Sequence, residues 1–115
     1  MFTRYAFTGL AAAFFACLLV QVFLAGLAIF VHPANWARHV SFVHLFELLP
    51  LLMLLFGWLG RMPRKLLWQS AGFFGLIILL YLTANIRTVL PGAAAAHPVI
   101  ALLLSGLAYV VMVEA

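Results

Sequence analysis

Four long apolar stretches, separated by short polar or proline-containing segments, account for most of the chain. They cover residues 5–31, 40–60, 66–87 and 94–113. A helix needs about 20 predominantly apolar residues to cross the hydrocarbon core of a bilayer, and each stretch is long enough to do so. The pattern therefore predicts four transmembrane helices. The first stretch is too long for the apolar part of a signal peptide, so we expect it to be retained.

The connections between the four stretches are short. The middle one holds the run Gly-Arg-Met-Pro-Arg-Lys at residues 60–65, and the other two contain Pro33 and Pro91. Short connections make consecutive helices antiparallel neighbours. We therefore expect an all-α, polytopic membrane protein with one domain, residues 1–115, whose four transmembrane helices form an up-down-up-down bundle. In such a bundle the first helix lies diagonally opposite the third, and the second opposite the fourth.

The composition supports the same class of protein. Hydrophobic residues make up 69% of the chain and charged residues only 7%, whereas a soluble domain is roughly half apolar and a quarter charged. So few charges cannot cover a water-exposed surface, which excludes a soluble globular protein and makes the lipid bilayer the main partner. The net charge of +4 does not indicate nucleic-acid binding, because the basic residues lie between apolar stretches and form no basic face.

The basic residues also predict an orientation. Most of them lie on the side of the two chain termini, and the others on the opposite side: Arg4, Arg61, Arg64 and Lys65 against Arg38 and Arg87. Cytoplasmic loops of membrane proteins carry the excess of Lys and Arg. We therefore expect a multi-pass protein of the cell membrane with both termini in the cytoplasm.

Glu47 is the only carboxylate inside a predicted helix, and an ionisable side chain within a bilayer is costly and marks a functional site by default. His44 lies three residues earlier, on the same helix face. Pro50 removes an N–H group that the helix would use, so we expect a kink beside this pair. The alternative interpretation is that Glu47 only hydrogen-bonds a neighbouring helix, through Gln21 or Asn85, and stabilises the bundle.

The four histidines, all predicted on the outer side, suggest a cofactor. His32 and His39 are expected to be solvated loop residues. His44 lies on the second predicted helix and His97 on the fourth, at similar depth on diagonally opposed helices. Haem iron takes axial ligands from opposite sides, so His44 and His97 are candidate ligands of haem b.

Further residues are candidates for the same haem site. Arg38 and Arg87 lie on the side of the histidines and are suited to hydrogen-bond the haem propionates. Gln21 belongs to a stripe of small residues along the first helix, which either packs helices together or leaves room for a flat ligand. This interpretation predicts a haem-binding or electron-transfer-associated protein, an electron carrier rather than an enzyme. Glu47 would tune its site, and its partner would be a membrane redox protein or a second copy of the chain.

Three alternatives remain open. His44, Glu47 and His97 form a two-histidine, one-carboxylate set that suits iron or zinc with an open position. Glu47 is also a candidate for the central carboxylate of a small-solute or proton carrier. Against this, we expect it about 10 Å from the outer end of its helix, whereas transporter sites lie near the midplane. The last alternative is a structural or assembly subunit without a cofactor.

A resemblance rests on five blocks of the sequence, at residues 21–27, 42–47, 50–53, 60–63 and 97–101. They look like an uncharacterised family of small bacterial four-span membrane proteins of unknown function. More distantly, the arrangement of one histidine in the second helix and one in the fourth is similar to that in one half of haem A synthase and in the four-helix b-type cytochromes. This resemblance implies haem binding. This chain has one such bundle instead of two, and its carboxylate follows the second-helix histidine, whereas that of haem A synthase precedes it. The resemblance therefore does not extend to catalysis of haem modification.

Overall fold

The computed structural model describes residues 1–115 and contains helices but no strands. The helices are α1 (Phe2–Phe30), α2 (Asn35–Phe46), α3 (Leu49–Leu59), α4 (Arg64–Asn85), α5 (Pro91–Ala94) and α6 (Ala96–Glu114). Four helical segments are long and apolar enough to cross a membrane: α1, α2 with α3, α4, and α5 with α6. The prediction of an all-α protein with four helices able to span a membrane is confirmed.

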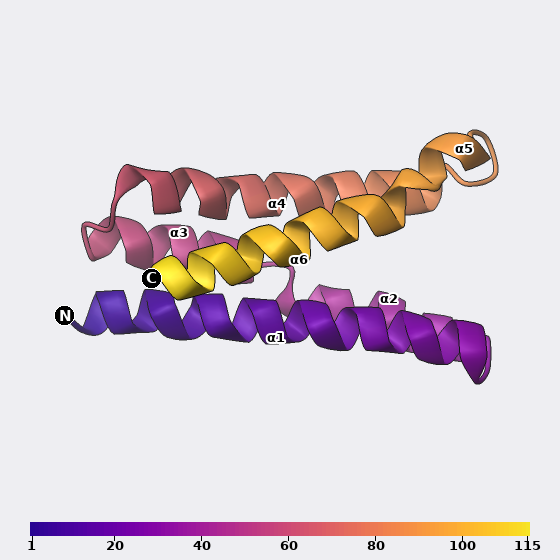
Figure 1. Cartoon of the computed structure of the whole chain (residues 1–115), viewed down its shortest axis with the longest axis horizontal. Helices are drawn as coiled ribbons and strands as arrows, with labels where there is room; N and C mark the ends of the chain where they lie inside the picture. The colour runs from indigo at the N-terminus through magenta and orange to yellow at the C-terminus, as the bar shows by residue number, and fades with distance from the viewer.

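Neighbouring spans run antiparallel (Figure 1). Both termini lie at one end of the molecule, together with the α3–α4 connection, whereas the α1–α2 connection and α5 lie at the opposite end. Helix α1 packs against α2, α3 and α6, and α4 packs against α3 and α6. The first and third spans are therefore diagonal, and so are the second and fourth, which confirms the predicted bundle. The longest dimension is 45 Å, which matches a bilayer of about 40–45 Å including its headgroup regions.

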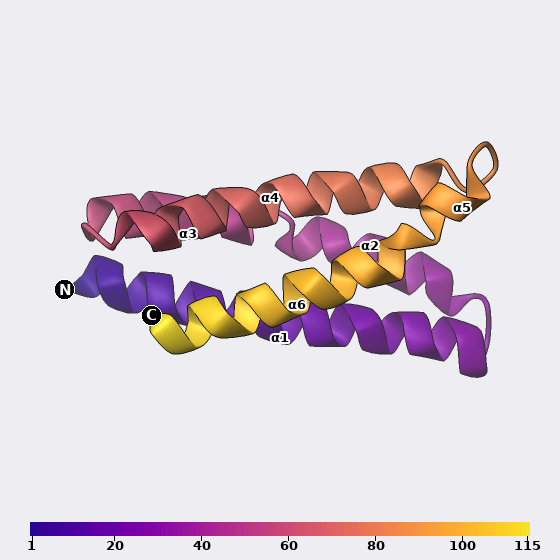
Figure 2. The ribbon, with the colours of Figure 1, turned by 45° about the horizontal axis from the view of Figure 1, so that its top comes forward.

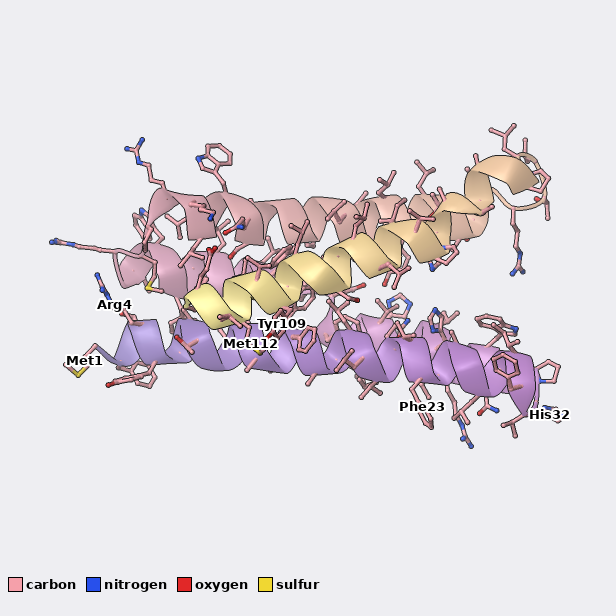
Figure 3. The ribbon with its side chains drawn as sticks, in the orientation of Figure 1. Met1, Arg4, Phe23, His32, Tyr109 and Met112 are labelled. Carbon is pink, nitrogen blue, oxygen red and sulfur yellow. The ribbon has the colours of Figure 1, made fainter.

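The buried core is small and lies mainly in the half of the bundle nearer the termini. The rings of Phe14 and Phe73 stack with centroids 5.5 Å apart and so join the diagonal helices α1 and α4. On another side of α1, the ring of Tyr109 from α6 meets that of Phe15 at 5.6 Å (Figure 3). Only 17 of the 115 residues are buried, and Phe23 points away from the bundle (Figure 3). Most apolar side chains therefore face outward, as they do where the solvent is lipid.

Polar contacts tie the helices together at the end that carries the termini. Arg4 donates hydrogen bonds to the carbonyl oxygens of Gly60, at 2.8 Å, and Arg61, at 3.2 Å. These carbonyls follow the end of α3, so Arg4 satisfies acceptors that a helix C-terminus leaves open. Lys65 at the start of α4 pairs with Glu114 at the end of α6, with 3.1 Å between Nζ and Oε1.

Gly57 marks the closest approach of α3 to its neighbours. A Cβ at this position would lie 2.7 Å from Cδ2 of Leu67 and 3.0 Å from Cδ2 of Phe7, whereas a Cβ at Gly106 would meet no atom within 4 Å. Because the Phe7 ring is fully buried, it has little room to move aside. The interface between α1, α3 and α4 therefore requires glycine at residue 57.

We predict that Gly57→Ala lowers the free energy of unfolding in detergent by about 1–3 kcal/mol through overpacking. Gly106→Ala is the matched control, and we expect it to leave stability unchanged or slightly increased, because Ala favours a helix more than Gly does. Loss of far-UV circular dichroism during denaturant titration measures both effects. An equal loss of stability in the two variants would contradict the packing described for Gly57.

Candidate functional site

The second span is interrupted between α2 and α3, at Glu47 and Leu48. Pro50 has no N–H group to donate to the carbonyl of Phe46. The N–H of Leu51 bonds to the carbonyl of Leu48, at 3.0 Å, and makes no bond to that of Glu47. The predicted kink is therefore confirmed as a break in the helix. Figure 2 shows α3 lying along α4, whereas α2 diverges from α4 towards α1.

The bounds of the second span place Glu47 farther from the start of its helix than expected. The span runs over Asn35–Leu59, so it begins five residues before the expected start at residue 40. Glu47 is the middle residue of the 25 in this span, about 18 Å along the chain from either end at 1.5 Å per residue. Along this helical segment the carboxylate is therefore equally far from both ends, and its depth in a membrane stays a prediction.

Three polar side chains meet at the break in the second span. Tyr81 of α4 donates its hydroxyl hydrogen to Oε2 of Glu47. Nδ1 of His44 lies 3.1 Å from the Tyr81 hydroxyl oxygen and 3.4 Å from Oε2 of Glu47. The imidazole also stacks on the Tyr81 ring, with centroids 5.7 Å apart. We call these three residues the His44–Tyr81–Glu47 cluster.

The hydrogen bonds of the cluster have a defined direction. The Tyr81 hydroxyl has a single proton, which it donates to Glu47. Its oxygen can then only accept from His44, so the imidazole carries its hydrogen on Nδ1. The side chain of Glu47 is 29% exposed and that of His44 is 57% exposed. The result is a continuous hydrogen-bonded path from an exposed imidazole to a carboxylate in the middle of a span.

Sequence analysis placed His44 and Glu47 on one face, and the structure confirms that they are in contact. It did not identify Tyr81, because a lone tyrosine in an apolar helix is indistinguishable from a packing residue until the neighbouring helix is placed. Neither of the expected alternative partners, Gln21 and Asn85, contacts Glu47. Gln21 bonds to His39 instead, and the Asn85 side chain bonds to the carbonyl of Tyr81.

Gln21 and His39 join α1 to α2 by reciprocal hydrogen bonds. Nε2 of Gln21 donates to the carbonyl of His39 at 2.8 Å, and Nδ1 of His39 lies 2.9 Å from the carbonyl of Gln21. His39 is part of α2 and half-buried, so the expectation of a solvated loop residue was wrong for it. His32, by contrast, is exposed in the α1–α2 connection, as expected.

His97 lies against α4 but not beside His44. Its Nδ1 is 3.0 Å from the carbonyl of Leu80 and 3.1 Å from Oγ1 of Thr83. Leu80 and Thr83 share one face of α4, whereas Tyr81, which contacts His44, lies about 100° around the helix from Leu80. The structure therefore brings His44 and His97 to different sides of the same helix.

The remaining residues of the expected cofactor and metal sites are dispersed. Arg38 and Arg87 are exposed, and neither side chain contacts a histidine. No group of three or more His, Cys, Asp or Glu side chains is close enough to hold a metal ion, so the set of His44, Glu47 and His97 is not assembled. As these side chains lie, they do not fit a haem held between His44 and His97, and that assignment stays a prediction.

We predict that Tyr81→Phe destabilises the protein by about 1.5–3 kcal/mol, because Glu47 loses a hydrogen bond to a charged group. Tyr109→Phe is the matched control, since Tyr109 is more than half exposed and hydrogen-bonds no other residue. The effect of Tyr81→Phe should shrink in a Glu47→Gln background, where the acceptor is no longer charged. Denaturant titration in detergent measures all three variants, and equal effects of Tyr81→Phe in both backgrounds would contradict the pairing.

Comparison with known proteins identifies the family of this chain but gives no activity for it. A family model described as a family of unknown function (DUF6220) matches residues 21–88. The matched region contains the whole His44–Tyr81–Glu47 cluster and ends before His97. No curated protein and no solved structure matches the chain, so the resemblance to haem A synthase is not shown. Because the family model covers more than half of the chain, this protein, with four helices long and apolar enough to span a membrane, belongs to the DUF6220 family.

Proposed function

We propose that the protein is a proton-linked membrane carrier in which Glu47 binds and releases the proton. The observation that carries this proposal is the position of Glu47, the only carboxylate away from the ends of the spans, at a helix break in the middle of the second span. Ionisable side chains inside a bilayer mark ion and proton pathways. Discontinuous helices near the midplane are typical of the binding sites of transporters.

The hydrogen-bonded cluster supplies a path for the proton. His44 is the exposed end of the path, and its Nε2 is free to take a proton from water or from a solute. Transfer of the Nδ1 proton to the Tyr81 oxygen, with the Tyr81 proton passing to Glu47, leaves a neutral imidazole, a neutral tyrosine and a protonated carboxyl group. The net result is one proton moved from water or a solute to Glu47, with His44 left neutral as the tautomer that carries its hydrogen on Nε2 and the Tyr81 hydroxyl directed at Nδ1 of His44.

Protonation of Glu47 also has a structural consequence. A carboxylate in hydrocarbon requires hydrogen-bond donors, whereas a neutral carboxyl group has a much smaller desolvation cost. Loss of the charge therefore weakens the requirement for the bond from Tyr81. Helix α2 packs mainly on α1, whereas α3 packs on both α1 and α4, so α2 is the less constrained half of the second span. We infer that uptake of the proton lets α2 move relative to α4.

The proposed orientation places both termini in the cytoplasm. Arg4, Arg61, Arg64 and Lys65 lie at the end that carries the termini and the α3–α4 connection (Figure 1). This excess of basic residues supports a cytoplasmic assignment of that end. In this orientation the exposed side of His44 opens towards the outer half of the membrane.

We predict that Glu47→Gln abolishes proton flux. The purified protein is placed in vesicles of phosphatidylcholine and phosphatidylglycerol that enclose a pH-sensitive dye, and a potassium diffusion potential drives protons inward. The flux should fall at least about tenfold in Glu47→Gln, because the only ionisable carboxylate of the path is removed. Tyr81→Phe should also slow the flux, because it interrupts the hydrogen-bonded path.

Glu114→Gln is the matched control for this experiment. Glu114 is the other carboxylate of the chain and pairs with Lys65 at the end of the bundle, so its loss should leave the flux unchanged. A flux in Glu47→Gln equal to that of the unmodified protein would reject the role of Glu47. A flux no greater than in protein-free vesicles for the unmodified protein would reject proton transport and favour a structural or assembly subunit.

Haem binding is the second candidate function, and one observation favours it. In both His44 and His97, Nδ1 is held by a hydrogen-bond partner on α4, and Nε2 makes no contact with the protein. Imidazoles that ligate a metal are usually held in this way through their other nitrogen. The two rings nevertheless approach different sides of α4, so binding of one iron by both would require a rearrangement of the outer half of the bundle.

The haem hypothesis predicts b-type absorbance bands in a reduced-minus-oxidised spectrum of protein purified from a haem-replete host. These bands should disappear in both His44→Ala and His97→Ala. They should persist in His32→Ala, because His32 is exposed in the α1–α2 connection. The absence of bands in the unmodified protein, or their persistence when both proposed ligands are replaced, would reject haem binding through these residues.

A further inference from the structure

Two adjoining grooves follow α3 towards the end of the bundle that carries the termini. The larger, of about 430 Å³, is lined only by apolar side chains, and the smaller, of about 300 Å³, has Arg61 in its lining. The lining residues are Leu51, Leu54, Leu55, Trp58 and Leu67 in the larger groove and Trp58, Leu59 and Arg61 in the smaller. Trp58 belongs to both, so the two form one continuous surface, which we call the α3 groove.

The α3 groove runs in the direction that a lipid acyl chain takes in a bilayer. Leu51, Leu55 and Trp58 are spaced four and three residues apart and therefore lie on one face of α3. From Leu51 to Trp58 this face is about 10 Å long, at 1.5 Å per residue, and it runs along the axis of the bundle. Trp58 is 67% exposed, and tryptophan is enriched at the level of the lipid headgroups. The apolar part of the groove thus leads from the membrane interior to the headgroup region.

Arg61 is a cation without a protein partner at the headgroup end of this groove. It is exposed, and its side chain makes no hydrogen bond or ion pair. Of the neighbouring cations, Arg4 donates to two backbone carbonyls and Lys65 pairs with Glu114, whereas Arg64 is exposed like Arg61 but does not line the groove. Arg4 also bonds the carbonyl of Arg61 itself, at a residue with a φ of 53°, and so helps to hold the backbone beneath this side chain.

We propose that the α3 groove binds one anionic phospholipid, with an acyl chain against its leucines and the phosphate at Arg61. A guanidinium group forms paired hydrogen bonds with a phosphate in a geometry that an ammonium group cannot match. A phospholipid without a cationic headgroup presents that phosphate with no competing positive charge. The site is independent of Glu47, so it does not depend on the proposed proton transport.

A second copy of the chain is a less suitable occupant of the same surface. A parallel, two-fold symmetric contact through α3 would bring the two Arg61 side chains to the same end of the membrane, where like charges repel. No acidic side chain there is free to compensate them, since Glu114 pairs with Lys65 and Glu47 lies in the middle of its helical span. The phosphate of a lipid supplies the missing negative charge.

Quenching of Trp58 fluorescence by brominated lipids tests the proposal. Replacing the other two tryptophans, Trp36 and Trp68, by Phe leaves Trp58 as the only tryptophan of the chain. Its fluorescence then reports on the groove alone. In vesicles of mixed lipids at equal mole fraction, we expect brominated phosphatidylglycerol to bind at this site about threefold more strongly than brominated phosphatidylcholine, as one exposed ion pair allows. Arg61→Gln should remove this preference, and high salt should reduce it.

Two controls make the result specific. A protein that retains only Trp68, which is 76% exposed on α4, and that also carries Arg64→Gln, because the exposed Arg64 lies one turn before Trp68 on the same helix face, should show no preference between the two lipids. Arg38→Gln, which removes an exposed arginine at the opposite end of the bundle, should leave the preference at Trp58 unchanged. Equal quenching of Trp58 by both lipids, the same preference at Trp68, or a preference that survives Arg61→Gln would overturn the proposal. Protection of Trp58 from both lipids would likewise overturn it and indicate that a second copy covers the groove.

Discussion

The interior of a bilayer offers no water to hydrogen-bond a backbone N–H or C=O group, so each such group must find its partner within the protein. This constraint explains why the chain consists of helices and nothing else. It also makes the interruption between α2 and α3 the most informative feature of the molecule. Pro50 removes one donor, and the carbonyls of Phe46 and Glu47 lose the partners that a continuous helix would give them.

The break and the polar cluster depend on each other. The N–H of Glu47 still donates to the carbonyl of Val43, at 2.9 Å, but the break leaves the Glu47 carbonyl without the N–H of Leu51 and places residue 47 in a two-residue turn between α2 and α3. The carboxylate of Glu47 needs hydrogen-bond donors at this position. Two lie within reach, the hydroxyl of Tyr81 and Nδ1 of His44. Because the effective dielectric constant there is low, a charge at this position responds strongly to any change in its partners. A proton is the smallest ligand that produces such a change.

Packing divides the bundle into two halves with different properties. In the half nearer the termini, buried aromatic side chains such as Phe7, Phe14 and Phe73 join three helices, and Arg4 and Lys65 fasten the helix ends. In the other half, α2 leaves α4 and packs mainly on α1. The half nearer the termini holds the α3 groove. The other half carries the four histidines and Tyr81, where fewer buried side chains join the helices.

The apolar stretches and the short connections between them determined the number of spans, their antiparallel order and the diagonal pairs. Pro50 predicted the kink, and the three-residue spacing placed His44 and Glu47 on one helix face. These features are local or follow from short connections, so one-dimensional periodicity suffices for them. Only the tertiary structure decided that Tyr81 completes the cluster, that Gln21 binds His39, and that Glu47 lies in the middle of its span. It also placed His97 on a different side of α4 from His44. Such relations depend on how each helix is rotated about its axis and where it begins, and these are set by packing between helices rather than by the order of residues within one.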